Sequence, residues 1–181
     1  MTTPPRTKGA LAWSLPNLAG PSTLTLTSPD FDHDGAIPAA HAAHRVGGQD
    51  LSPELSWSAV PDGTARLLLV IEDPDAPTPM PFVHGLALLD PSVTRLTRGA
   101  LNAATPAEGV RLLRSGIGSG YFGPAPPKSH GPHLYAFQLF ALATPPAVAK
   151  GPLEAARPRD VLAGAGGVLA RGRLDGTYRR T

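Results

Sequence analysis

Residues 120–142 restrict the possible folds of this chain more than any other part of the sequence. The first half of the stretch contains three glycines and four prolines, so it can hold one irregular shape without a ladder of backbone hydrogen bonds. The second half, residues 134–142, is aromatic or aliphatic at every position except Gln138. A run of this kind predicts a central strand that is buried on both faces.

Two earlier segments have the same character. Residues 67–71 are an unbroken aliphatic run, and residues 82–89 are a third apolar run that contains His84, so both predict strands of a shared core. Residues 23–27 alternate between threonine and leucine, which predicts a half-buried strand. The 20 glycines and 22 prolines fall between such short runs. This pattern of turns and short strands favours a mainly β fold.

We expect a single domain, because a chain of 181 residues is long enough to bury a sizeable core. The domain is expected to span residues 23–181, preceded by an N-terminal extension at residues 1–22. Residues 158–169 predict a short helix, because a proline opens the segment and Asp160 lies in its first turn. Residues 174–178 predict a turn followed by an edge strand.

The composition argues against several classes of function. The formal net charge is only +2 and the arginines are scattered, apart from a group near the C-terminus, so we expect no nucleic-acid partner. Without cysteine the chain can form no disulfide and no thiolate site. The apolar residues 11–15 are cut short by Pro16, so we expect no membrane insertion and a cytoplasmic location.

Two segments contain metal-ligating residue types, yet neither completes a known metal motif. Residues 30–35 match the start of a calcium loop, but its twelfth position is His41 instead of glutamate. His41 and His44 are spaced by one helical turn without the carboxylate of a zinc-protease motif. We interpret the first segment as an acidic surface turn and the second as an exposed histidine pair, and we expect no metal cofactor.

Asp73 and Asp75 follow the strand predicted at residues 67–71, on a turn stiffened by Pro74 and Pro77. Two interpretations are open. The aspartates can cap the end of the strand, as this residue type does in tight turns, or they can orient or charge groups in a pocket. The rigidity of the turn and its two acids favour the pocket.

His133 and Tyr135 stand where the rigid stretch enters the last predicted strand, two residues apart and therefore on one face. A carboxylate beside an imidazole raises its pKa, so His84 or His133 is expected to be cationic near neutral pH. Exposed loop amides such as that of Gly123, together with the Tyr135 hydroxyl, would add donors that suit an oxyanion. No motif couples a serine to a base, so we expect no activated nucleophile.

The motifs Asp73-Pro-Asp-Ala-Pro77 with His84, and Gly120-Tyr-Phe-Gly-Pro-Ala-Pro-Pro127 followed by His133-Leu-Tyr135, resemble those of the phosphatidylethanolamine-binding protein family. The resemblance is greatest to its bacterial Raf-kinase-inhibitor-like branch and covers nearly the whole chain. It implies a Greek-key β-sandwich with a large antiparallel sheet, a smaller sheet and one or two short helices. It also implies a pocket for a phosphate-like anion or a phosphoethanolamine head group, lined by Asp73, Asp75, Pro77, His84, Gly123, Pro124, His133 and Tyr135.

Two positions depart from the usual pattern of the family. Gly85 stands where the family usually has tryptophan, which is expected to widen the mouth of the pocket. Leu134 stands where it usually has arginine, which removes a charge next to the site.

Three hypotheses for the function follow. The first is a non-catalytic module that binds a small anion or phospholipid head group; the resemblance implies that it modulates a kinase or protease partner and forms a homodimer. The second is a metal-dependent or acid–base hydrolase that uses Asp73, Asp75, His84 and His133, since such side chains can hold a divalent ion. The third is an interaction protein with a vestigial pocket, motivated by the two departures.

Overall fold

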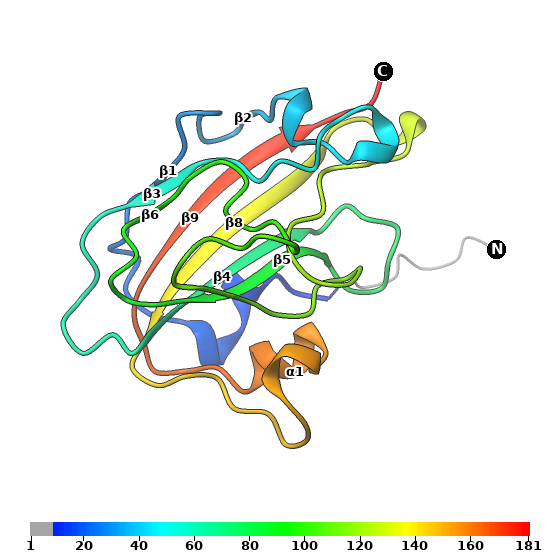
Figure 1. The fold of residues 1–181 in the computed structure, drawn as a ribbon. Coiled ribbons are helices and arrows are strands. Elements are labelled where there is room, and N and C mark those ends of the chain that lie inside the picture. The colour runs from blue at the N-terminus through cyan, green and yellow to red at the C-terminus, as the bar shows by residue number, and fades with distance from the viewer. Residues whose placement is uncertain (1–8) are drawn as a thin grey trace.

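The computed structural model describes residues 9–181 as a mainly β structure with two sheets (Figure 1). The strand order is β2-β9-β8-β4-β5-β7 in the larger sheet and β1-β3-β6 in the smaller one. The strands are β1 (Leu26–Thr27), β2 (Gly35–Ala36), β3 (Leu55–Trp57), β4 (Arg66–Asp73), β5 (Phe82–Leu89), β6 (Arg95–Leu96), β7 (Val110–Leu112), β8 (His133–Leu142) and β9 (Val168–Tyr178). The helical segments are α1 (Pro158–Ala163) and the 3₁₀ turns η1 (Ala12–Ser14), η2 (Pro16–Leu18), η3 (Ala39–His41), η4 (His44–Val46), η5 (Lys128–His130) and η6 (Leu153–Ala155). The predicted mainly β fold with a larger and a smaller sheet is confirmed.

The three apolar runs form the centre of the larger sheet, as predicted. β4 pairs antiparallel with both β5 and β8, and Leu69 lies opposite Ala87 on one side and Leu139 on the other. One face of these strands packs against the smaller sheet, through residues such as Leu26 and Leu55, and forms the first core. The other face packs against α1 and the N-terminal 3₁₀ turns and forms the second core (Figure 1). Both faces of these strands are therefore buried, which explains why β4, β5 and β8 carry apolar residues on both faces.

A buried polar network fastens the N-terminal turns to the second core. Glu72 in β4 is fully buried, and its Oε2 accepts hydrogen bonds from the Ala12 amide at 2.7 Å and the Gln138 side chain at 2.8 Å. Its Oε1 pairs with Arg159 in α1. Gln138 Oε1 accepts the Trp13 amide at 2.7 Å. The one polar residue of the last apolar run therefore binds a segment more than a hundred positions away.

The C-terminal region differs from the prediction in two respects. The helix α1 ends at Ala163 and not at residue 169, because glycines follow it and Gly167 adopts a left-handed backbone with φ of 64°. Val168 instead begins β9, which pairs with β8 up to Tyr178, so residues 174–178 are regular strand and not a turn. Among the described residues, no helix has the length and hydrophobicity that a bilayer crossing requires.

The antiparallel order gathers distant segments at one end of the larger sheet. There the C-terminal ends of β4 and β9 meet the N-terminal ends of β5 and β8, with Asp73 opposite Phe82 and His133 opposite Tyr178. The turns η3, η4 and η5 lie near the same end, beside the C-terminus (Figure 1).

Candidate functional site

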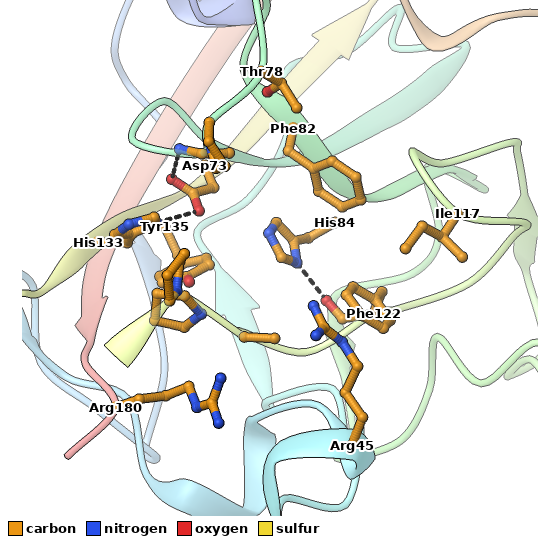
Figure 2. Close-up of a pocket in the computed structure, with 15 residues that line it drawn as sticks. Arg45, Asp73, Thr78, Phe82, His84, Ile117, Phe122, His133, Tyr135 and Arg180 are labelled. Carbon is orange, nitrogen blue, oxygen red and sulfur yellow. Dashed lines mark hydrogen bonds and ion pairs between the residues drawn. The ribbon is translucent and has the colours of Figure 1, made fainter. Parts of the chain in front are cut away.

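A pocket of about 450 Å³ lies at this end of the larger sheet (Figure 2). Five of the eight residues that the family resemblance assigned to a pocket line it, namely Asp73, Pro77, His84, His133 and Tyr135. The other lining residues are Arg45, Ala76, Thr78, Phe82, Ile117, Phe122, Ala125, Pro126, Pro127 and Arg180. The remaining three predicted residues, Asp75, Gly123 and Pro124, are not part of the lining.

A β-bulge in β5 directs His84 into the pocket. The pairing of β5 with β4 shifts between Ile71 and Glu72, so His84 is an extra residue without a partner on β4. With strict alternation, His84 and Phe82 would share the face of Leu86, which lies in the second core. The bulge turns both aromatic side chains to the opposite face, where they line the pocket.

Asp73 has both of the roles considered for the Asp-Pro turn. Its Oδ1 accepts hydrogen bonds from the amides of Asp75 at 2.7 Å and Ala76 at 3.0 Å, which caps the end of β4. Its Oδ2 lies 2.8 Å from Nδ1 of His133, and both side chains are buried. Asp75 lies outside the pocket, where its Oδ2 accepts the Leu134 amide at 2.9 Å. The two aspartates thus fix the turn to the first residues of β8.

Two polar atoms of the pocket have no hydrogen-bond partner among the described residues. His133 uses Nδ1 for Asp73, while its Nε2 is buried and unpaired. The hydroxyl of Tyr135 is also buried and unpaired. Burial raises the pKa of Tyr135 well above its usual range, so the hydroxyl keeps its proton. Leaving such groups unpaired costs about 1–3 kcal/mol each, a cost that a ligand in the pocket could offset.

His84 forms an uncharged wall of the pocket. Its Nδ1 lies 2.6 Å from the Phe122 carbonyl oxygen, which can only accept, so Nδ1 carries the proton. Burial lowers the pKa of His84 to about 4, although this hydrogen bond and Asp73 oppose the shift. The expectation of a cationic ring near neutral pH is therefore wrong for His84. The ring packs edge-on against Phe82 and Tyr135, with centroid separations of 4.9 and 5.1 Å.

Two arginines that no sequence motif indicated supply positive charge. Arg45 belongs to η4, and its Cζ lies 5.6 Å from the centroid of the Phe122 ring. Arg180 follows β9 near the end of the chain. Both line the pocket, and Figure 2 shows them on the side opposite Asp73. Neither guanidinium forms an ion pair with another described residue.

Gly123 and Pro124 support the pocket wall from outside. The Gly123 amide donates to Asp50 Oδ1 at 2.8 Å, so it is not an exposed donor as predicted. A Cβ at this position would lie 2.4 Å from the carbonyl oxygen of His41, so only glycine fits without a backbone shift. The Pro124 carbonyl accepts the Ala43 amide at 3.0 Å. These contacts join two loops that are about eighty positions apart.

The two departures from the family pattern lie beside the pocket and not in its lining. Gly85 is buried, and a Cβ there would meet Ile71 of the first core at 3.2 Å. The expected widening of the pocket mouth by the absence of tryptophan stays a prediction. Leu134 is half-buried next to the pocket. Leu134 supplies no charge at the position where the family usually has arginine, but Arg45 and Arg180 place positive groups in the lining.

The segment with His41 and Asp30 differs from the prediction. His41 is buried and not exposed, with Nδ1 at 2.6 Å from the Leu51 carbonyl and Nε2 at 3.6 Å from Asp30. The Asp30 side chain is also buried and pairs with Arg98, so it is no surface acid. His44 is exposed, as expected. Sequence alone could not show the burial of His41, because it depends on how the loop packs its ring against Leu51 and Asp30.

The acids and imidazoles of the pocket do not converge as a metal site would require. Within residues 9–181, the one group of three potential ligands whose atoms lie within 4.8 Å of one another is His33, Asp34 and Asp175, none of which lines the pocket. Both carboxylate oxygens of Asp175 already accept hydrogen bonds from Arg173, at 2.7 and 2.9 Å.

Comparison with known sequences agrees with the motifs. A model of the phosphatidylethanolamine-binding protein family matches residues 27–179. A UPF0098 protein of Aquifex aeolicus is 32% identical over 168 residues, which cover 90% of this chain and 92% of that protein. The UPF0098 protein YbhB of Escherichia coli is 34% identical over 124 residues, which cover 66% of this chain and 78% of YbhB.

Solved structures give the same result. YbcL of Escherichia coli superposes with a TM-score of 0.75 at 27% identity, covering 88% of this chain and 100% of YbcL. CT736 of Chlamydia trachomatis superposes with a TM-score of 0.70 at 28% identity, covering 87% of this chain and 98% of CT736. YbcL is described as a new member of the mammalian phosphatidylethanolamine-binding protein family, and CT736 as a homologue of such proteins. The chain therefore belongs to the phosphatidylethanolamine-binding protein family.

Proposed function

We propose that this protein is a non-catalytic binding module whose pocket holds a small phosphate-type anion, as free phosphate or as the phosphate of a phosphoethanolamine head group. Membership of the family supports a binding role. The observation that carries the proposal is the presence of two buried, unpaired polar atoms in one pocket, His133 Nε2 and the Tyr135 hydroxyl. Buried polar atoms are nearly always paired, so each calls for a partner.

In this proposal the anion accepts hydrogen bonds from β8. Asp73 holds Nδ1 of His133, so a second proton on the imidazole would be carried by Nε2 and directed at the ligand. The hydroxyl of Tyr135, two positions further along the same strand, donates a second hydrogen bond to the anion. Arg45 and Arg180 add attraction for negative charge. Charge-assisted donors of this kind suit an oxyanion.

The other predicted residues have supporting roles in the same proposal. Pro77 and His84 shape the wall of the pocket. Asp75, Gly123 and Pro124 hold the surrounding loops through the backbone hydrogen bonds described above.

The hydrolase hypothesis has less support. An Asp–His pair can orient a general base, but catalysis by that route also needs a nucleophile within its reach. The Ser115 hydroxyl donates within its own loop, to the Ile117 carbonyl at 3.1 Å. The ligand atoms of Asp73, Asp75, His84 and His133 do not form a group that could hold a metal ion.

The proposal extends to a partner protein, such as a kinase or protease, whose activity the module modulates. A homodimer is also proposed, and sedimentation that shows only monomer across the accessible concentrations would rule it out. A cytoplasmic location and the lack of a nucleic-acid partner stay predictions.

Calorimetric titration of inorganic phosphate and phosphoethanolamine, after an assay of metal content, tests the proposed function. We expect saturable binding to the metal-free protein, loss of binding in His133→Ala, and retention in His130→Ala. His130 is a matched control, because it stacks on His133 at 5.6 Å but is exposed and does not line the pocket. No binding of either anion, or equal binding by both variants, would refute the proposal and favour a vestigial pocket.

A further inference from the structure

We infer that Arg45 and Arg180 make the pocket selective for phosphomonoester dianions that carry no amine, so that ethyl phosphate binds more tightly than phosphoethanolamine. The inference rests on the proposed function, because it requires a phosphate group near His133 and Tyr135. The property inferred here is the charge that the pocket tolerates on the part of the ligand outside its phosphate group.

Among the described residues, the pocket lining offers one carboxylate, and it already has other partners. Asp73 is the one acidic residue in this part of the lining, and its Oδ1 accepts two backbone amides. Its Oδ2 is paired with His133. An ethanolamine ammonium would therefore lose hydration without gaining an anionic partner, which is unfavourable.

The uncharged His84 does not alter this balance. Burial lowers its pKa to about 4, so at neutral pH the ring adds no charge to a lining that has two guanidinium groups and one carboxylate, which is hydrogen-bonded to His133. The lining is thus positive overall, which favours a ligand with two negative charges and no positive one.

The position of Arg45 is supported by a dedicated set of contacts. Asp50 accepts the His44 amide with Oδ2 and the Gly123 amide with Oδ1, both at 2.8 Å. Asp50 does so with φ of 49°, a left-handed conformation that is uncommon for residues other than glycine. It thereby joins the turn that carries Arg45 to the loop that carries Phe122, over whose ring Arg45 lies.

Arg180 is placed by the end of the larger sheet. Tyr178, two residues earlier, pairs with His133 in the β8–β9 ladder. Arg180 therefore leaves the sheet next to the proposed phosphate donors, and Figure 2 shows its guanidinium on the same side of the pocket as that of Arg45. A phosphate held by His133 and Tyr135 would have both cations nearby.

Ethyl phosphate and phosphoethanolamine form a suitable probe pair, because they differ in one terminal ammonium group. Both phosphates are mainly dianionic at pH 7.5. We would titrate each into the wild type at low salt by calorimetry. Repulsion between an ammonium and two guanidinium groups at several ångströms, in a medium of intermediate dielectric, predicts at least about fivefold tighter binding of ethyl phosphate, or about 1 kcal/mol.

The double variant Arg45→Gln/Arg180→Gln is expected to bind ethyl phosphate at least about tenfold more weakly and to lose the preference. Arg179→Gln is the control for position, since it removes one positive charge next to Arg180, at a side chain that is exposed and outside the pocket. This control should keep the wild-type ratio of affinities, and added salt should reduce that ratio.

The failure of this inference is distinct from failure of the proposed function. If inorganic phosphate binds and His133→Ala abolishes binding, but ethyl phosphate and phosphoethanolamine bind equally, the selectivity is overturned and the anion pocket stands. A ratio that survives in the double variant would likewise overturn the assignment to these two arginines. Absence of phosphate binding altogether would overturn both.

Discussion

The buried, neutral His84 makes the stability of this protein depend on pH in a way that one substitution should remove. His84→Asn deletes the titrating ring but retains an N–H group that can donate to the Phe122 carbonyl, as Nδ1 does at 2.6 Å. The variant also loses ring contacts with Phe82 and Tyr135. That loss lowers stability by an amount that does not depend on pH, so it cancels when two pH values are compared.

The magnitude follows from the linkage between protonation and folding. The unfolded chain binds the proton of this imidazole with a pKa near 6.5, and the folded protein with a pKa of about 4. Protons therefore favour the unfolded state, so the stabilisation is complete above pH 6.5 and is lost as the pH falls toward 4. Between pH 7.5 and pH 5 the loss amounts to about 2 kcal/mol.

Urea denaturation of the wild type and His84→Asn at a series of pH values measures this contribution. Effects of groups far from His84 are common to both proteins, so the difference between the two curves reports the contribution of the substituted side chain. We expect the wild type to lose about 2 kcal/mol more free energy of unfolding than the variant between pH 7.5 and pH 5. Parallel curves would show that His84 titrates normally and would refute the account of its burial.

Three further substitutions have definite expected results. Tyr135→Phe should weaken phosphate binding by about tenfold in calorimetry without lowering the melting temperature, because its hydroxyl has no partner in the fold; unchanged affinity would contradict this. Gly123→Ala should lower the free energy of unfolding in urea by about 2 kcal/mol or more, because its Cβ would lie 2.4 Å from backbone atoms. In the control Gly166→Ala the nearest atom to the new Cβ lies at 3.7 Å, so this substitution should cost little. Equal losses of stability in the two variants would argue against the close approach at Gly123. Glu72→Gln should cost about 1–3 kcal/mol and speed proteolysis of the N-terminal turns, since it disturbs a fully buried acceptor; an unchanged proteolytic rate would mean that the network does not hold this segment.

The central strands were predictable because each follows a local rule. Their residues are apolar on both faces, and the structure buries both faces in separate cores. The exception, Gln138, was visible in the sequence, but its partners Glu72 and Trp13 were not. The helix predicted at residues 158–169 is too long, because the opening proline and Asp160 indicate where a helix begins, whereas Gly164 and the following glycines end it after Ala163.

The pocket was predictable only where its residues lie in recognisable motifs. Asp73, His133 and Tyr135 belong to such motifs and meet at one end of the sheet. Arg45 and Arg180 are 135 positions apart and belong to no motif or periodic pattern, so only the fold brings them together.

Hydrogen bonding and register caused the remaining differences. Strict alternation places His84 on the second core, and only its pairing with β4 reveals the bulge that redirects it. The sequence shows that Gly123 is conformationally free, but not that its amide is taken by Asp50, 73 positions away. Pairing with distant residues therefore decides which polar groups remain available to a ligand.

A crystal structure of the protein with phosphate at saturating concentration tests the central claim most directly. The account predicts a phosphate in the pocket, with oxygens within about 3.2 Å of His133 Nε2 and the Tyr135 hydroxyl. A phosphate bound elsewhere, or a pocket without phosphate under conditions where calorimetry shows binding, would contradict it.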